Sequence, residues 1–201
     1  MLSPIKKLSF AISLVFLAAF ISPTQEAPSW KPDKPHSFVN FSIGHLFSVV
    51  TGRFTEFEGD FNFDPNNVEG SKASFTVYVN SIETDTKARN EHLKTADFFD
   101  AKKYPTITFV STKITRRSAT KFKVYGKLTI KDVTKDVVLP LKITGQMESP
   151  LAKNTMVLGV DIKTTIKRSD YGVGVNQWAM TTIVGDDVDI HIPMELIRPI
   201  K

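Results

Sequence analysis

The stretch that decides the fold runs from Lys121 to Lys131 and reads K-F-K-V-Y-G-K-L-T-I-K. Its apolar and small residues take every second position, at Phe122, Val124, Gly126, Leu128 and Ile130. The positions between them hold Lys121, Lys123, Tyr125, Lys127, Thr129 and Lys131. Successive side chains of a strand leave the backbone on opposite faces, so this period of two predicts a β-strand with one apolar and one polar face.

Comparable alternation recurs along the chain and predicts an all-β protein. The eight expected strands cover residues 37–43, 52–63, 72–80, 106–114, 121–131, 135–147, 155–166 and 185–197. Residues 86–95 show no alternation and no proline, which predicts one short helix between the third and fourth strands. Eight strands joined mostly by short turns favour an antiparallel sheet closed into a barrel, because closure removes the exposed edges. A sandwich of two sheets is the alternative.

The first 22 residues have the pattern of a signal peptide. Lys6 and Lys7 precede an apolar run over residues 8–21, and Pro23 follows it closely. The run is short for a membrane span, and a buried helix is the other interpretation. We therefore expect cleavage between residues 19 and 27 and a periplasmic or secreted protein. The mature chain is expected to have no transmembrane span and to form one barrel domain over residues 28–201.

Composition narrows the classes of function. Charged residues make up 23% of the chain and hydrophobic residues 41%, as in ordinary folded domains. The net charge of +5 falls to +3 without the two lysines of residues 1–22. No patch of lysines interleaved with stacking aromatics is evident, so we expect no nucleic-acid partner. With no cysteine, the chain has neither a disulfide nor the cysteine of a lipid-anchored lipoprotein.

The sequence pattern offers no catalytic residue and no metal site. The four histidines are His36, His45, His92 and His191. None of them has the H-x-x-x-H spacing or another spacing typical of metal ligands, and no G-x-S-x-G motif occurs. We therefore expect a protein that is not an enzyme.

The lysines of residues 121–131 also indicate which way the apolar faces point. A barrel with its apolar faces toward lipid would crowd these lysines into a narrow interior, where unpaired like charges are costly. With the apolar faces inward, the lysines lie in water instead. The phenylalanines of the inward faces then form either a filled core or the wall of a cavity, and composition leaves both open.

Five motifs carry a resemblance to a known family. They are H-S-F-V-N-F-S-I-G-H-L at 36–46, G-R-F-T-E-F-E-G at 52–59, the run at 81–111, G-K-L-T-I-K-D-V-T-K at 126–135, and I-K-R-S-D-Y-G at 166–172. In these motifs the chain resembles the YceI-like proteins, exported lipocalin-like barrels that bind polyisoprenoids. Two positions depart from the family pattern: Asn90 stands where aspartate is usual, and Asp132 where glycine is usual.

The resemblance implies non-enzymatic carriage of an isoprenoid lipid, a polyprenyl chain or a quinone tail, inside a lipocalin-like barrel without a cofactor. This hypothesis places the cavity wall at Phe41, Phe57, Phe61, Phe75, Phe109, Val124, Leu128, Leu139, Leu158, Val160 and Trp178. In a filled barrel these side chains would pack on one another, and Trp178 would cover a loop. The alternative function is then that of an interaction or scaffold protein without bound lipid. A homodimer stays open in either case.

Basic residues near the expected helix are candidates for contact with the ligand head group. Arg89 and His92 are three residues apart and share one side of a helix. Together with Lys94 and Arg168 they would meet a pyrophosphate or a quinone ring. The other interpretation is that the helical residues fix the helix to the barrel rim, and that Arg168 pairs with Asp170 in a turn.

Overall fold

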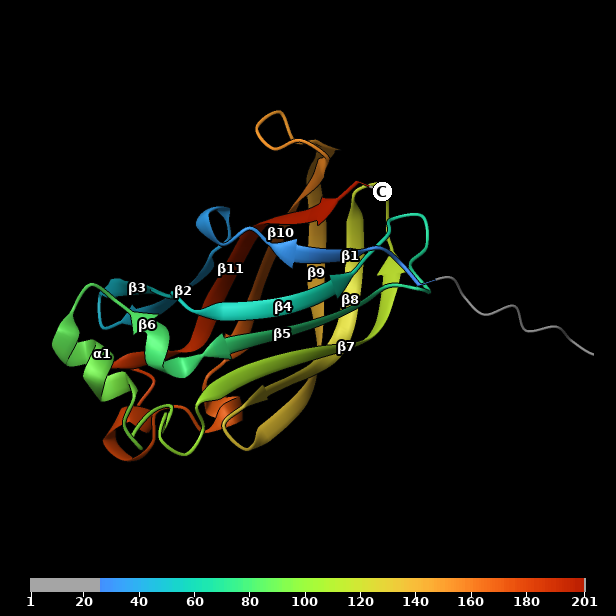
Figure 1. Cartoon of the computed structure of the whole chain (residues 1–201). Coiled ribbons are helices and arrows are strands. Elements are labelled where there is room, and N and C mark those ends of the chain that lie inside the picture. The colour runs from blue at the N-terminus through green and yellow to red at the C-terminus, as the bar shows by residue number, and fades with distance from the viewer. Residues whose placement is uncertain (1–25, 201) are drawn as a thin grey trace, which may run out of the picture.

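The computed structural model describes residues 26–200, and this part of the chain contains eleven strands and one α-helix (Figure 1). The strands are β1 (Ser29–Pro32), β2 (Val39–His45), β3 (Ser48–Phe54), β4 (Phe57–Asn62), β5 (Lys72–Tyr78), β6 (Ile82–Glu83), β7 (Thr106–Arg116), β8 (Lys121–Ile130), β9 (Val133–Glu148), β10 (Thr155–Lys167) and β11 (Val184–Pro199). The helix α1 (Lys87–Leu93) lies between β6 and β7, within the predicted range 86–95. Short 3-10 helices cover Lys34–His36, Val79–Ser81, Ser169–Tyr171 and Asn176–Ala179.

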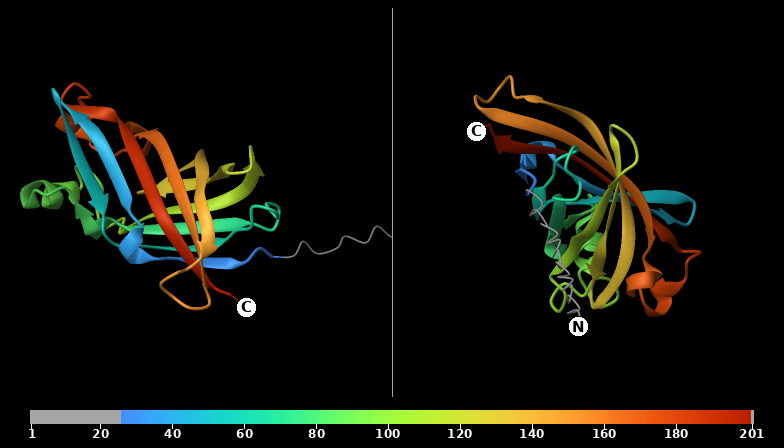
Figure 2. Two further views of the ribbon diagram at one scale, coloured as in Figure 1. Left: turned by 90° about the horizontal axis from the view of Figure 1, so that it is seen from above. Right: turned by 90° about the vertical axis from the view of Figure 1, so that its right-hand side faces the viewer.

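The eleven strands follow eight antiparallel paths around a closed barrel. Both β1 and β2 pair with β11 on one edge, and on the other edge they pair with β4 and β3 respectively. In turn β4 pairs with β5 and β3 with β6, so each of these three paths consists of two strands in series. Strands β7 to β11 complete the ring, whose curvature is visible in Figure 2. The predicted eight-stranded antiparallel barrel is thereby confirmed.

The single strand predicted over residues 52–63 is wrong, because the chain breaks there into β3 and β4. Phe54 ends β3, Phe57 begins β4, and both side chains are buried. A regular strand would turn residues 54 and 57 to opposite faces, so burying both requires a break between them. At the break the Thr55 N–H donates to the Ser81 carbonyl over 3.1 Å, and the Glu56 carbonyl accepts from the Tyr78 N–H over 3.0 Å.

The strands β1 and β6 have too few residues for a recognisable period of two, and the sequence did not predict them. The importance of β1 lies in Trp30, whose side chain is almost fully buried. Its indole Nε1 donates to the Phe63 carbonyl over 2.9 Å. This strand therefore seals the barrel where it lies between β4 and β11.

The apolar faces of the strands point inward, as the lysines of β8 indicated. Phe122 and Val124 are buried, whereas Lys121 and Lys127 on the same strand are exposed. Around Trp30 the core is solid, and the rings of Phe63 and Phe122 meet edge to face with centroids 5.3 Å apart. A second cluster of buried side chains packs against Leu93 at the end of α1 and contains Phe98, Ile130, Tyr171 and Val173. No helix in residues 26–200 is long and apolar enough to cross a bilayer.

Candidate ligand cavity

The barrel encloses a cavity of about 610 Å³ with an almost entirely apolar wall. Small-molecule sites typically have volumes of roughly 300–1,000 Å³, so this space is large enough for a ligand. Nine side chains that the sequence hypothesis assigned to the wall lie in it: Phe41, Phe61, Phe75, Phe109, Val124, Leu128, Leu139, Val160 and Trp178. Their contact with a lipid stays a prediction.

The other two residues of that hypothesis, Phe57 and Leu158, lie outside the cavity wall. The Phe57 ring packs against the Phe75 ring with centroids 5.5 Å apart, and so supports a wall residue from behind. Leu158 is fully buried in the solid part of the core, opposite Leu196 of β11. A period of two assigns both residues to the inner face, but it carries no information about which inner side chains border empty space.

Five aromatic wall residues were missing from the sequence hypothesis: Phe54, Phe63, Phe98, Phe99 and Tyr171. Phe54 lies 5.7 Å from Phe41 between ring centroids, and Phe99 meets Phe54 edge to face at 6.1 Å. Phe54 is the residue that interrupts the alternation before β4. Phe99 lies in the turn segment after α1, and its N–H donates to the carbonyl of Leu93, the last residue of the helix, over 3.1 Å. The adjacent phenylalanines of D-F-F-D at 97–100 were the available signal for this wall segment.

Glycines on the inner face make room for aromatic wall residues. The ring of Phe109 lies where a side chain at Gly126 would be, and the ring of Phe41 does the same at Gly52. A β-carbon at either glycine would overlap ring atoms. Because the rings occupy this space against the sheet, they leave the middle of the barrel open.

The cavity opens beside the start of α1, where the wall residues Thr86 and Ala88 are exposed. Nearby, β3 pairs with β6 only through Arg53 and Phe54, so the outer edge of residues 48–52 has no strand partner in the described chain. The turn between β2 and β3 lies at the same end of the barrel as α1 (Figure 1). It carries two exposed apolar side chains, Leu46 and Phe47. We define this end as the mouth.

Arg89 and His92 of α1 both reach the cavity wall at the mouth. The Arg89 guanidinium folds back on the chain before the helix and donates to the Thr84 hydroxyl and carbonyl, over 2.9 Å each. The imidazole Nε2 of His92 lies 3.1 Å from Asp97 Oδ2, and its ring packs edge to face on Trp178. Lys94 lies outside the wall, and its Nζ donates to Glu91 Oε1 over 3.0 Å.

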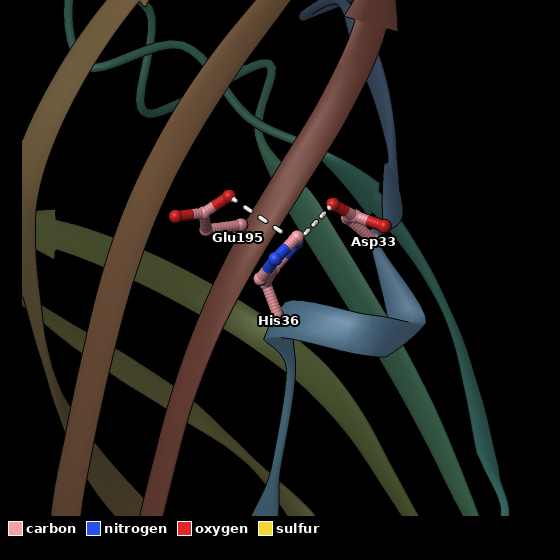
Figure 3. A group of neighbouring side chains, drawn as sticks. All are labelled: Asp33, His36 and Glu195. Carbon is pink, nitrogen blue, oxygen red and sulfur yellow. Dashed lines mark hydrogen bonds and ion pairs between the residues drawn. The ribbon is translucent and has the colours of Figure 1, made fainter. Parts of the chain in front are cut away.

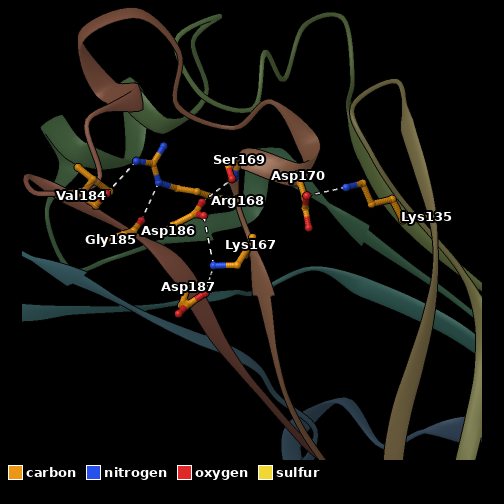
Figure 4. Close-up of polar contacts among 9 residues, drawn as sticks. All are labelled: Lys135, Lys167, Arg168, Ser169, Asp170, Val184, Gly185, Asp186 and Asp187. Carbon is orange, nitrogen blue, oxygen red and sulfur yellow. Dashed lines mark hydrogen bonds and ion pairs between the residues drawn. The ribbon is translucent and has the colours of Figure 1, made fainter.

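Arg168 is buried at the same end, and it is held by backbone oxygens (Figure 4). Its guanidinium donates to the carbonyls of Gly185, Val184, Val173 and Gly174 at distances of 2.7–3.2 Å. Burial lowers the pKa of this guanidinium, and the charge of Asp186 opposes that shift. These contacts tie the loop after β10 to the start of β11, which is a structural role.

The expected pair between Arg168 and Asp170 is wrong. The carboxylate of Asp170 instead lies 2.6 Å from the Nζ of Lys135, on the neighbouring strand β9 (Figure 4). The two residues are separated because the 3-10 helix Ser169–Tyr171 turns Asp170 outward while Arg168 points under the loop. The carboxylate whose charge acts on the Arg168 guanidinium is that of Asp186. Hydrogen bonds from Ser169 lower the pKa of the Asp186 carboxyl.

The closed antiparallel barrel and its apolar cavity define a lipocalin-like class of structure. A family model described as the YceI-like domain matches residues 30–196, and the chain belongs to this family. Protein YceI of Escherichia coli O157:H7 is 36% identical over 194 residues, which cover 95% of each chain. A UPF0312 protein of Pseudomonas aeruginosa LESB58 is 34% identical over 184 residues, covering 90% of this chain and 93% of the relative.

Solved structures show the same barrel. BcnA of Burkholderia cenocepacia superposes with a TM-score of 0.73 at 32% identity, covering 83% of this chain and 99% of BcnA. A structure described as a polyisoprenoid binding domain from Saccharophagus degradans superposes with a TM-score of 0.63, covering 85% of this chain and 98% of that domain. Its sequence is only 15% identical, so this second similarity concerns the fold alone.

Proposed function

We propose that the protein binds an isoprenoid-type lipid, a polyprenyl chain or a quinone tail, and carries it without catalysing a reaction. The observation that supports this most strongly is the apolar cavity of about 610 Å³ inside the closed barrel. Each methylene moved from water into such a wall contributes about 0.8 kcal/mol, before the cost of ordering the tail. A polar ligand of the same size would lose its hydrogen bonds to water and find few partners in the wall.

The mouth supports a position for the head group beside α1. Arg89 and His92 border the cavity there and carry N–H groups that an anionic or carbonyl oxygen can accept from. Arg168 also borders the cavity, but its Nε, Nη1 and Nη2 all donate to backbone carbonyls, whereas the hydrogen bonds of Arg89 within the described residues come from Nε and Nη2 only. Lys94 lies outside the wall. The proposed head-group contacts are therefore those of Arg89 and His92.

The similarity in fold to a polyisoprenoid binding domain agrees with this proposal. The predicted signal peptide lies outside the described residues, and we propose a periplasmic or secreted location on its sequence pattern. N-terminal sequencing of the protein from a cell fraction would test this location. A homodimer is the remaining open expectation, which sedimentation equilibrium would decide.

A matched pair of substitutions on β7 tests lipid binding. Phe109 lines the cavity, whereas the next residue, Val110, is exposed on the outer face. Farnesol titrated into delipidated protein should bind the native chain and Val110→Asp equally, and should not bind Phe109→Asp. Because a buried aspartate also strains the fold, Val160→Phe is the second variant, which narrows the cavity with an apolar ring. Equal farnesol affinity in all four proteins would contradict the proposal.

The head group is tested separately with farnesyl pyrophosphate and farnesol. Replacing Arg89 by alanine should weaken binding of the pyrophosphate and leave the affinity for the alcohol unchanged. Equal affinity of both proteins for the pyrophosphate would remove Arg89 from the proposed contacts. If neither probe binds and organic extracts of the purified protein hold no lipid, the result favours the alternative function, that of an interaction or scaffold protein without bound lipid.

A further inference from the structure

Three side chains on the outside of the barrel come together from two distant parts of the chain (Figure 3). Asp33 precedes the 3-10 helix between β1 and β2, His36 is the last residue of that helix, and Glu195 projects from β11. We propose that Asp33, His36 and Glu195 form a binding site for a divalent metal ion of the zinc type. The site is separate from the lipid cavity and does not depend on the proposed function.

The donor atoms are close enough to share one ion. The distance from His36 Nδ1 to Asp33 Oδ2 is 2.8 Å, and that to Glu195 Oε2 is 3.9 Å. The three donor atoms all lie within 4.8 Å of one another. Zinc takes imidazole nitrogen and carboxylate oxygen at about 2.0–2.2 Å, which separates ligand atoms by roughly 3.3–3.6 Å. Small side-chain rotations bring the present distances into that range.

The backbone holds the three residues in place without the ion. The main-chain carbonyl of Glu195 accepts from the Asp33 N–H over 2.8 Å and from the buried Ser37 hydroxyl over 3.1 Å. The Phe38 N–H donates to the Pro193 carbonyl over 2.9 Å. The turn that carries Asp33 and His36 is thus fastened to β11 at both of its ends. A ligand set preorganised in this way loses little conformational freedom on binding.

The charge of the group favours a cation. Neither Asp33 nor Glu195 has an ion pair with a lysine or arginine in the described residues, and each is paired only with His36. With a neutral imidazole, two carboxylates therefore face each other without compensation.

A second histidine–carboxylate pair provides an internal comparison. His191 Nε2 lies 2.6 Å from Asp161 Oδ1, and Lys163 also lies 3.9 Å from that carboxylate. Within residues 26–200, no third acid, histidine or cysteine joins this pair at the spacing found around His36. His191 should therefore be a poor ligand although it contacts a carboxylate as closely as His36 does.

Zinc titration of the full mature chain, first stripped with a chelator, tests the proposal. We expect one saturable equivalent of Zn²⁺ by calorimetry, with affinity reduced by about 10- to 100-fold in His36→Ala and in Glu195→Gln. His191→Ala is the matched control and should bind as the native chain does. Because Glu195→Gln keeps the backbone contacts and the side-chain volume, its loss of affinity would not reflect unfolding.

The same titration contains the results that would overturn the site. Absence of a saturable equivalent in the native chain would do so, as would equal affinity of His36→Ala and His191→Ala, which indicates adventitious binding to surface histidines. X-ray absorption at the zinc edge gives a second readout, with one imidazole and two carboxylates in the ligand shell. A shell with two imidazoles would also contradict the assignment.

Discussion

Truncation of two phenylalanines should separate the solid part of the core from the cavity wall. Phe122 is almost fully buried against Phe63 and borders no empty space, so Phe122→Ala should cost about 3–5 kcal/mol of the free energy of unfolding. Phe109 is buried to a similar extent, but its ring borders the cavity. A ring with one side facing empty space lacks roughly half of the dispersion contacts of a core ring, so Phe109→Ala should cost only about 1.5–2.5 kcal/mol.

Urea denaturation of the delipidated proteins, followed by circular dichroism, measures both costs. Repeating it with saturating farnesol should widen the gap between the native chain and Phe109→Ala, because a bound ligand stabilises only the protein that retains its wall. Equal costs for the two substitutions in the delipidated state would mean that side chains fill the space beside Phe109. The reasoning about the cavity would then be wrong.

Three further substitutions test the polar contacts near the mouth. Replacement of Arg168 by Lys removes several hydrogen bonds to backbone carbonyls and should lower the free energy of unfolding by about 2–4 kcal/mol. Urea denaturation measures this loss, and a loss below about 0.5 kcal/mol would contradict the structural role given to the guanidinium. The Asn90 amide donates to Glu83 Oε1 over 2.8 Å, so Asn90→Asp would place two carboxylates side by side and should lower the melting temperature at pH 7. The melting temperature of this variant should approach that of the native chain in acid, where both carboxyls are protonated. The hydrogen bond from Asn90 lowers the pKa of Glu83, so the stability that Glu83 contributes is complete above its ordinary pKa of 4.5 and is lost as the pH falls through the lower folded value. The melting temperatures of the native chain and Glu83→Gln should therefore converge between pH 5 and pH 3, and a gap that stays constant would refute this origin.

Much of the fold was predictable because the alternation of apolar and polar residues indicates, position by position, which side chains of a strand are buried. The strand predicted over 121–131 is β8, whose inner residues are buried and whose lysines face solvent. The break at Thr55 was not predicted, since it depends on hydrogen bonds to Ser81 and Tyr78, which other paths bring alongside. Local sequence patterns carry no information about such long-range contacts. For the same reason they do not predict that β1 closes the barrel.

The cavity wall was predictable only in part, for a related reason. The residues of the inner faces were predicted correctly, but Phe57 and Leu158 lie behind the cavity wall. Phe57 contacts Lys34 of the 3-10 helix after β1, and Leu158 lies opposite Leu196 of β11. The spacing of residues in the sequence could not predict the group of Asp33, His36 and Glu195 on the outside of the barrel. Glu195 follows the other two by more than 150 residues, and only the pairing of β1 and β2 with β11 brings them together.

The most direct test of the central claim is an NMR measurement on methyl-labelled protein loaded with farnesol. Cross-relaxation from the farnesol chain should reach the inward methyl groups of Val124, Leu128 and Leu139. It should be absent at Val110 and Val138, which point outward from the same sheet. Signals at the outward methyls without signals at the inward ones would show that the lipid binds outside the barrel, and the account of an internal carrier site would be refuted.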